Sequence, residues 1–186
     1  MAWIKFLTEY VKSPRTVGAL APSSPSLAEK MVNDIDFRRA KCIVEYGPGT
    51  GVFTEKLISN KRSDTLLILF EYNERFYKQL SEKYNDVDNL TIINDSAEYI
   101  EKYLKQYNIE KVDYIVSGLP FASLPKSVSN KILESTQNVL RKGGLFITFQ
   151  YTLLKKDYIE NYFSDISYNR VFINLPPAYV LKCENG

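Results

Sequence analysis

The sequence predicts an α/β fold with a doubly wound, mostly parallel, seven-stranded sheet, a C-terminal antiparallel β-hairpin and an N-terminal helical extension. Three observations lead to this fold class. Short apolar runs alternate with longer segments of helical periodicity through the middle of the chain. The runs are apolar at nearly every position, which favours strands covered on both faces. Two further strand-like runs are separated only by Asn174–Pro177, and so short a connection predicts a hairpin.

The individual elements follow from this alternation, since strand–helix repeats form a parallel sheet through right-handed crossovers. The expected strands of the parallel part are Cys42–Tyr46, Thr65–Phe70, Leu90–Asn94, Val112–Ser117 and Gly144–Tyr151. The expected helices between them are Val52–Asn60, Asn73–Tyr84, Ala97–Tyr107 and Lys126–Arg141. Lys142-Gly143-Gly144 is expected to end the last of these helices, because glycine favours the backbone conformation that follows a helix.

The two ends of the chain depart from the repeat. A helix is expected at Lys155–Phe163, followed by hairpin strands at Ile166–Ile173 and Ala178–Cys183. Near the start we expect a helix over residues 1–12 and a second one at Ser26–Asn33, with Ser24 as its N-cap and Pro25 at its first position. We therefore divide the chain into an N-terminal helical segment, residues 1–34, and one domain, residues 35–186.

The composition excludes several classes of function. Lys and Arg number 24 and Asp and Glu 22, so the net charge is +2 and bulk charge cannot drive nucleic-acid binding. The absence of histidine excludes Ser-His-Asp and Cys-His nucleophiles, a His-ligated metal and a His general base. Cys42 and Cys183 lie far apart in apolar stretches, so we expect two reduced core thiols in a cytoplasmic protein and no metal site.

No stretch of the sequence predicts a membrane span or an export signal. The longest continuous apolar run, Leu66–Phe70, is far shorter than the ~20 residues that cross a bilayer. The first residues lack the basic start, the long apolar core and the small-residue cleavage site of a signal peptide. We therefore expect a chain that is neither transmembrane nor exported.

A glycine-rich loop, Glu45-Tyr46-Gly47-Pro48-Gly49-Thr50-Gly51, lies where the first strand meets the first long helix. It does not fit the G-x-G-x-x-G dinucleotide pattern, because Val52 occupies the sixth position, nor the phosphate-loop pattern, because no Gly-Lys-Ser/Thr follows. The form E-x-G-x-G-x-G is that of the S-adenosylmethionine (SAM) fingerprint of methyltransferases. The alternative is a glycine-rich turn that binds no ligand.

Two acidic residues follow the next two expected strands. Glu71, at the end of the second, can accept hydrogen bonds from both ribose hydroxyls of a nucleoside, and Tyr72 is expected beside it. Asp95-Ser96-Ala97, after the third, is suited to an adenine amino group. Taken singly, either acid reads as an N-cap or a solvated loop residue. Together with the loop they fall at the carboxyl ends of successive strands, where α/β folds bind ligands.

The fourth expected strand ends in Ser117-Gly118-Leu119-Pro120-Phe121. This turn is similar to the Asn/Asp-Pro-Pro-Tyr turn of adenine N6-methyltransferases, whose polar first residue helps hold the methylated amine. Here Ser117 and Gly118 replace the first position and Phe121 the aromatic, and the alternative is a proline-containing turn without function. Tyr151, at the end of the fifth strand, is expected near the methyl acceptor, because aromatic faces hold ammonium groups with ~0.5–2 kcal/mol per contact.

With these motifs the chain resembles, almost from end to end, the bacterial phospholipid N-methyltransferase family, relatives of the ribosomal RNA adenine dimethyltransferases. The stretches that carry the resemblance are Ser13-Pro14-Arg15, Val17-Gly18-Ala19, Pro22-Ser23-Ser24, Leu27-Ala28, Glu45–Thr54, Ser117–Pro120, Gly143-Gly144, Phe149-Gln150-Tyr151 and Asn174–Ala178. The glycine loop is common to very many methyltransferases. The Ser-Gly-Leu-Pro turn and the Asn-Leu-Pro-Pro-Ala hairpin are much narrower signals.

The resemblance implies a class I (Rossmann-like) methyltransferase that methylates the phosphatidylethanolamine headgroup amine stepwise towards phosphatidylcholine. SAM would be the donor and S-adenosylhomocysteine the product. The cofactor residues it implies are Ser23, Glu45, Tyr46, Gly47, Gly49, Thr50, Gly51, Glu71, Tyr72, Asp95, Ser96, Ala97, Ser117 and Gly118. The acceptor-site residues are Ser117, Leu119, Pro120, Phe121 and Tyr151.

The expected helix over residues 1–12 is amphipathic, with one apolar arc of Trp3, Ile4, Phe6, Leu7, Tyr10 and Val11. Lys5, Lys12 and Arg15 lie outside that arc, an arrangement suited to an anionic membrane surface. We expect peripheral association of a monomer with the inner face of the membrane. The alternative is a helix that folds over the SAM site as a lid.

Two alternative functions stay open at this stage. One is methylation of adenine N6 in RNA, against which stand the missing Asn of the fourth-strand turn, the near-neutral charge and the lack of a C-terminal helical RNA domain. The other is a SAM-binding or membrane-docking protein without turnover. In the enzyme, the acceptor ammonium must first lose a proton, and without histidine the base is a tyrosine, a carboxylate or water.

Overall fold

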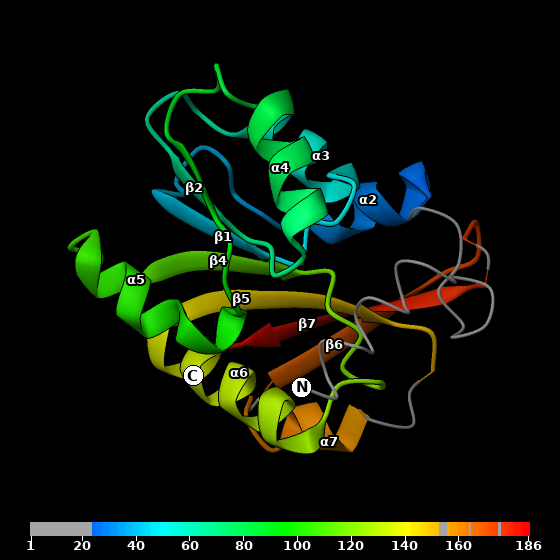
Figure 1. Ribbon diagram of the computed structural model, residues 1–186. Coiled ribbons are helices and arrows are strands. Elements are labelled where there is room, and N and C mark those ends of the chain that lie inside the picture. Colours follow the sequence, from blue (N-terminus) through cyan, green and yellow to red (C-terminus); the bar gives the residue numbers. More distant parts are fainter. Residues whose placement is uncertain (1–23, 153–155, 164, 175) are drawn as a thin grey trace.

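The computed structural model describes residues 24–152, 156–163, 165–174 and 176–186. A seven-stranded sheet in the order β3-β2-β1-β4-β5-β7-β6 forms its centre, as predicted (Figure 1). The strands are β1 Cys42–Tyr46, β2 Leu66–Phe70, β3 Leu90–Ile93, β4 Val112–Ser117, β5 Leu140–Gln150, β6 Asp165–Val171 and β7 Ala178–Glu184. All pairs from β3 to β5 are parallel, whereas β7 pairs antiparallel with both β5 and β6. The predicted C-terminal hairpin is therefore confirmed.

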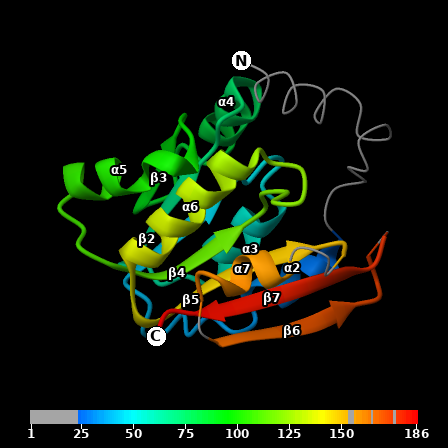
Figure 2. The same cartoon turned by 90° about the horizontal axis from the view of Figure 1, so that it is seen from below.

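Helices cover both faces of the sheet. One face carries α2 Pro25–Val32, α3 Val52–Asn60 and α4 Glu74–Lys83 (Figure 1). The other carries the 3-10 turn η1 Ala97–Tyr99 with α5 Ile100–Gln106, and then α6 Lys126–Val139 and α7 Lys156–Glu160 (Figure 2). Two separate hydrophobic clusters fill the two interfaces. This is the two-sided burial that the continuous apolar strands predicted.

Helix α2 begins as its sequence predicts. The Ser24 hydroxyl accepts a hydrogen bond from the Leu27 backbone N–H at 3.1 Å, and Pro25 takes the first helical position. The buried residues of the helix are Leu27, Ala28, Met31 and Val32, and they pack in the same cluster as α3. Residues 24–34 therefore share the core of the domain. The expected helix over residues 1–12, and Ser23, lie outside the described residues.

The expected helix stop at Lys142-Gly143-Gly144 is wrong. Helix α6 already ends at Val139, and β5 begins at Leu140, so both glycines lie within the strand. Gly143 has a φ of +67°, and a Cβ on Gly144 would be 2.9 Å from the Asp113 carbonyl oxygen. The glycines thus allow an irregularity at the start of β5, where the β4–β5 register shifts between Val112 and Tyr114.

Other boundaries differ by a few residues. Helix α7 is shorter than expected, and β6 ends at Val171 rather than Ile173, so that Phe172 and Ile173 belong to the turn. Both cysteines are free and buried, as predicted. Among the residues described, no helix is long and apolar enough to cross a bilayer, and no cluster of His, Cys, Asp or Glu is arranged to hold a metal.

Candidate functional site

The glycine loop joins β1 to α3 with a backbone that favours glycine. Gly47, Gly49 and Gly51 have φ values of +61°, +56° and +85°, in the left-handed region where other L-residues are strained by roughly 1–2 kcal/mol. Gly51 is the N-cap of α3. The loop lies at the carboxyl end of β1, the edge of a parallel sheet at which α/β folds bind ligands.

Gly47 in this loop and Gly118 in the turn after β4 permit close contact between the two segments. A Cβ on Gly118 would lie 2.6 Å from the Gly47 carbonyl oxygen, and one on Gly47 would lie 2.8 Å from Leu119 Cδ2. The Gly118 N–H also donates to the Tyr46 carbonyl oxygen at 2.8 Å. The predicted cofactor loop and the predicted acceptor turn are therefore in direct backbone contact.

Gly49 differs from its neighbours because its Cα faces open space. No heavy atom lies within 4 Å of the position a Cβ would take. Its N–H donates to Glu71 Oε2 at 2.9 Å, and the Asn73 N–H donates to Glu71 Oε1 at 2.8 Å. Burial raises the pKa of the Glu71 carboxyl, while these two bonds oppose that rise. The structure thus brings Gly49 and Glu71 together, as predicted from the strand ends.

Glu45 is a buried carboxyl beneath the loop. Its Oε2 accepts a hydrogen bond from the Thr54 hydroxyl at 2.7 Å, whereas its Oε1 is buried without a partner. Burial raises the pKa of Glu45 to about 8; the Thr54 bond opposes this rise and the Glu71 charge adds to it. At this pKa the carboxyl is mostly protonated at neutral pH. A cationic ligand group near its unpaired Oε1 would favour the ionised form, so the position at the start of the glycine loop fits such a group.

Asp95 holds its local turn together. Its Oδ1 accepts from the Ser96 N–H at 2.8 Å, and its Oδ2 accepts from the Tyr103 hydroxyl at 2.7 Å. That second bond is the main reason the pKa of Tyr103 is raised to about 12. Ser96 caps η1, and Ala97 is buried. Tyr72 is partly buried directly after Glu71, and its carbonyl oxygen is 3.4 Å from Asn94 Nδ2.

Several expected site residues turn their side chains into the core. The Tyr46 ring is fully buried, and its hydroxyl is 3.1 Å from the Thr136 hydroxyl. The Phe121 ring is 1% exposed and packs edge-on against Phe146, with centroids 6.0 Å apart. Ser117 is buried, and its hydroxyl accepts from the Leu119 N–H at 3.2 Å. Their assignment to the acceptor or cofactor site stays a prediction, and Tyr46 can contribute only its backbone.

Tyr151 lies on the opposite face of the sheet from Phe121. It is half-buried one residue beyond β5 and packs against Phe149, with centroids 5.5 Å apart. Burial raises the pKa of its hydroxyl, and a side-chain hydrogen bond with Asn174 opposes the rise. Tyr151 therefore stays protonated at neutral pH. Leu119 and Pro120, which directly precede Phe121 in the chain, are partly buried.

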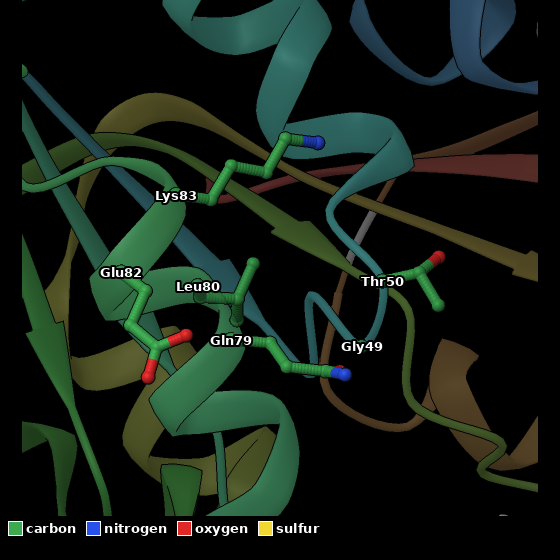
Figure 3. Close-up of a pocket in the computed structure, with 6 residues that line it drawn as sticks. All are labelled: Gly49, Thr50, Gln79, Leu80, Glu82 and Lys83. Carbon is green, nitrogen blue, oxygen red and sulfur yellow. The ribbon is translucent and has the colours of Figure 1, made fainter.

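A hollow of about 460 Å³ borders the glycine loop on the α4 side (Figure 3). It is lined by Gly49, Thr50, Gln79, Leu80, Glu82 and Lys83, with Gln79 extending from α4 towards Gly49. The sequence predicted α4 but assigned none of its side chains to the site. The only available signal was their spacing of three and four residues, which places them on one helix face.

Comparison with known proteins identifies the family. The sequence model of the ribosomal RNA adenine dimethylase family matches residues 23–160. The chain belongs to this family. The chain is also similar to an ornithine lipid N-methyltransferase of Singulisphaera acidiphila, 30% identical over 180 residues, which are 96% of this chain and 93% of that protein. The resemblance to lipid N-methyltransferases and ribosomal RNA adenine dimethyltransferases is therefore confirmed.

Other relatives are longer than this chain. Ribosomal RNA small subunit methyltransferase A of Borreliella burgdorferi is 31% identical over 110 residues, which are 59% of this chain but only 37% of that relative. Among solved structures, a Thermus thermophilus 16S rRNA N2 G1207 methyltransferase in complex with AdoMet and guanosine aligns with a TM-score of 0.67 at 17% identity, over 92% of this chain and 45% of that one. This likeness confirms the methyltransferase fold, and family and fold together imply SAM as the methyl donor.

Proposed function

We propose that this protein transfers methyl groups from SAM to the primary amine of a membrane-lipid headgroup, with phosphatidylethanolamine as the acceptor. The observation that carries the proposal is the match to a lipid N-methyltransferase over 96% of this chain and 93% of that relative. Ornithine lipid, named for that relative, also bears a primary amine, so the chemistry of the acceptor is the same. The Ser117-Gly118 start of the fourth-strand turn, where adenine N6-methyltransferases have Asn or Asp, favours a non-adenine acceptor.

The cofactor half of the site fits SAM through its shape and charge. The open space over Gly49 admits a ligand to the backbone, and the buried Glu45 Oε1 offers a partner to a positively charged group. Glu71 and Asp95 hold acceptor oxygens at the ends of β2 and β3, in positions suited to ribose hydroxyls and the adenine amine. When bound, SAM supplies an electrophilic methyl group on a sulfonium.

The acceptor half orients the amine and removes water from it. Transfer requires a neutral amine in line with the methyl group, so the acceptor ammonium first gives its proton to water, a carboxylate or a tyrosine. Alignment by the turn residues Ser117–Pro120 then provides most of the catalysis. Tyr151 is not the base, because its raised pKa keeps the hydroxyl protonated at neutral pH. Its ring instead holds the ammonium or methylated ammonium by a cation–π contact of ~0.5–2 kcal/mol.

The experiment that tests this function supplies labelled SAM with separate acceptors. We expect label in phosphatidylethanolamine vesicles, and a parallel assay with ornithine lipid measures the preference between two lipid amines. Vesicles of phosphatidylglycerol, which lack an amine, serve as the control. Label in neither aminolipid would overturn the proposal.

A second candidate is N6-methylation of adenine in RNA, favoured by the match of the adenine dimethylase family model to residues 23–160. The same assay tests it with 16S ribosomal RNA as acceptor, and label in RNA alone would establish it. A SAM-binding protein without turnover would label no acceptor while binding SAM in calorimetry. Docking of residues 1–12 on the inner face of the membrane belongs to the lipid proposal, and Trp3→Glu is expected to weaken binding to anionic vesicles while leaving SAM affinity intact.

A further inference from the structure

The turn that follows β6 exposes two apolar side chains, Phe172 and Ile173. Phe172 is 70% exposed and Ile173 is 77% exposed, the highest values among the exposed large hydrophobic side chains of the described residues. The sequence predicts both residues in a strand, where alternate side chains would be covered. Because β6 ends at Val171, both residues instead lie in the turn that follows it. We call Phe172, Ile173 and Asn174 the hairpin tip.

The hairpin tip lies at the same edge of the sheet as the candidate site. Strands β5 and β6 are both antiparallel to β7, so they run in the same direction and their carboxyl ends meet at one edge (Figure 2). That edge also carries the glycine loop after β1 and the turn after β4. The link to the acceptor side is direct, since Asn174 of the tip hydrogen-bonds with Tyr151.

The positively charged side chain of Arg170 lies next to the hairpin tip. The Arg170 guanidinium lies 4.8 Å from the centre of the Phe172 ring and 5.6 Å from that of the Tyr179 ring. Apolar side chains that project beyond an arginine are arranged for the boundary between lipid tails and headgroup phosphates. The arginine can reach a lipid phosphate while the side chains beyond it enter the apolar layer.

The chain that precedes the described residues joins them at this tip. The Ser24 N–H donates to Asn174 Oδ1 at 3.1 Å, and the Ser24 hydroxyl donates to the Ile173 carbonyl oxygen at 2.6 Å. Ser24, the first of the described residues, is therefore held at the hairpin tip by two hydrogen bonds.

We propose that the hairpin tip is a membrane contact in which Phe172 and Ile173 insert among lipid headgroups and Arg170 meets a lipid phosphate. This contact rests on the proposed lipid acceptor and holds the carboxyl-end edge of the sheet against the bilayer. A second protein is a poorer occupant, because two neighbouring side chains are far below the ~1,200 Å² that a stable interface buries. RNA is a poorer one because the chain carries a net charge of only +2.

The test compares the Phe172→Ser/Ile173→Ser double variant with the parent in co-sedimentation with phosphatidylethanolamine–phosphatidylglycerol vesicles. We expect vesicle binding to weaken about tenfold or more, because two large apolar side chains no longer leave water. Tyr107→Ser is the matched control: this residue is 47% exposed at the end of α5, which leads back to the opposite edge of the sheet, and the change should leave binding unaltered.

A direct measurement of insertion complements the sedimentation. In a Trp3→Phe background, Phe172→Trp places the only tryptophan of the chain at the tip. Its fluorescence should shift to shorter wavelength with vesicles and be quenched by lipids brominated near the headgroup end of the acyl chains. Unchanged fluorescence, or vesicle binding of the double variant equal to that of the parent, would overturn the proposal.

The failures of the contact and of the proposed function are distinguishable. A dispersed short-chain phosphatidylethanolamine needs no bilayer contact, so the double variant should methylate it like the parent and bind SAM with parental affinity in calorimetry. If the parent methylates no lipid, the proposed function fails, while vesicle sedimentation and fluorescence still decide the contact. If the double variant loses binding to 16S ribosomal RNA and keeps vesicle binding, the tip is an RNA contact and the proposal is wrong.

Discussion

The two halves of the candidate site are built in opposite ways. At the ends of β1 and β2, the backbone fixes the site: both Glu71 oxygens accept backbone N–H groups, and three glycines take left-handed conformations. At the ends of β4 and β5, partly buried residues such as Leu119 and Tyr151 form the surface that we propose for the acceptor. The difference supports the proposal of a preformed cofactor half and of an acceptor half in which side chains determine the substrate.

The largest expected effect is at the contact between the halves. Gly118→Ala would place a Cβ 2.6 Å from the Gly47 carbonyl oxygen. Because the Cβ is fixed to one backbone segment and the oxygen belongs to another, the clash is relieved only if the backbone moves. We expect the free energy of unfolding to fall by about 3 kcal/mol, measured by urea denaturation. Gly49→Ala is the control, since its Cβ meets nothing within 4 Å and only the conformational strain of ~1 kcal/mol remains. Equal losses in the two variants would show that packing between the halves is not tight.

Gly49→Val tests the cofactor half alone. The larger side chain fills the open space that we assign to the ligand, so SAM affinity should fall about a hundredfold, which corresponds to roughly 2.7 kcal/mol. Isothermal titration calorimetry measures this directly, and circular dichroism verifies that the variant is folded. Parental affinity in the folded variant would remove Gly49 from the SAM site.

Tyr151→Ala tests the acceptor half alone. Loss of the aromatic face should lower turnover about tenfold, within the ~0.5–2 kcal/mol of a cation–π contact, and change SAM affinity less than twofold. Tyr151→Phe keeps the ring and loses only the hydrogen bond with Asn174, so it should retain most of the turnover. Parallel losses of turnover and SAM affinity in Tyr151→Ala would mean that the two halves do not act separately.

A pH dependence is also expected within the cofactor half. The pKa of Glu45 is about 8 in the folded chain, well above its ordinary value of 4.5. Between pH 4.5 and pH 8 the folded state therefore binds more protons than the unfolded state. The free energy of unfolding therefore falls as pH rises from about 5 to 8, and SAM affinity rises as the carboxylate forms. Glu45→Gln removes the ionisation and should flatten both profiles. A steep affinity profile that survives in this variant would point to another group.

Local patterns predicted the cofactor half, because its positions follow strand ends. The glycine spacing placed the loop, and the residues after the second and third strands placed Glu71 and Asp95 at the same edge. The partner of Glu45 was not predicted, since Thr54 is an ordinary first-turn residue of a helix. The inward orientation of Phe121 depends on how the turn after β4 packs against β5, which no local periodicity encodes.

The contacts of Asn174 were beyond any local pattern. Its partner Ser24 lies 150 residues away in the sequence. The sequence marks Asn174 only as part of the turn that carries the family resemblance. Likewise, apolar residues extended the expected strand to Ile173, because periodicity cannot distinguish the end of a strand from an exposed apolar turn. The acceptor half thus depends on tertiary contacts between distant residues, which local sequence patterns do not predict.

The bonds between Ser24 and the β6–β7 turn impose an order on biosynthesis. A ribosome that has made Ser24 must add 150 residues before Asn174 exists to accept the hydrogen bond from the Ser24 N–H. Strand β7, which lies between β5 and β6 in the sheet, is made later still. The carboxyl-end edge of the sheet is therefore complete only after the β6–β7 turn and β7 have left the ribosome.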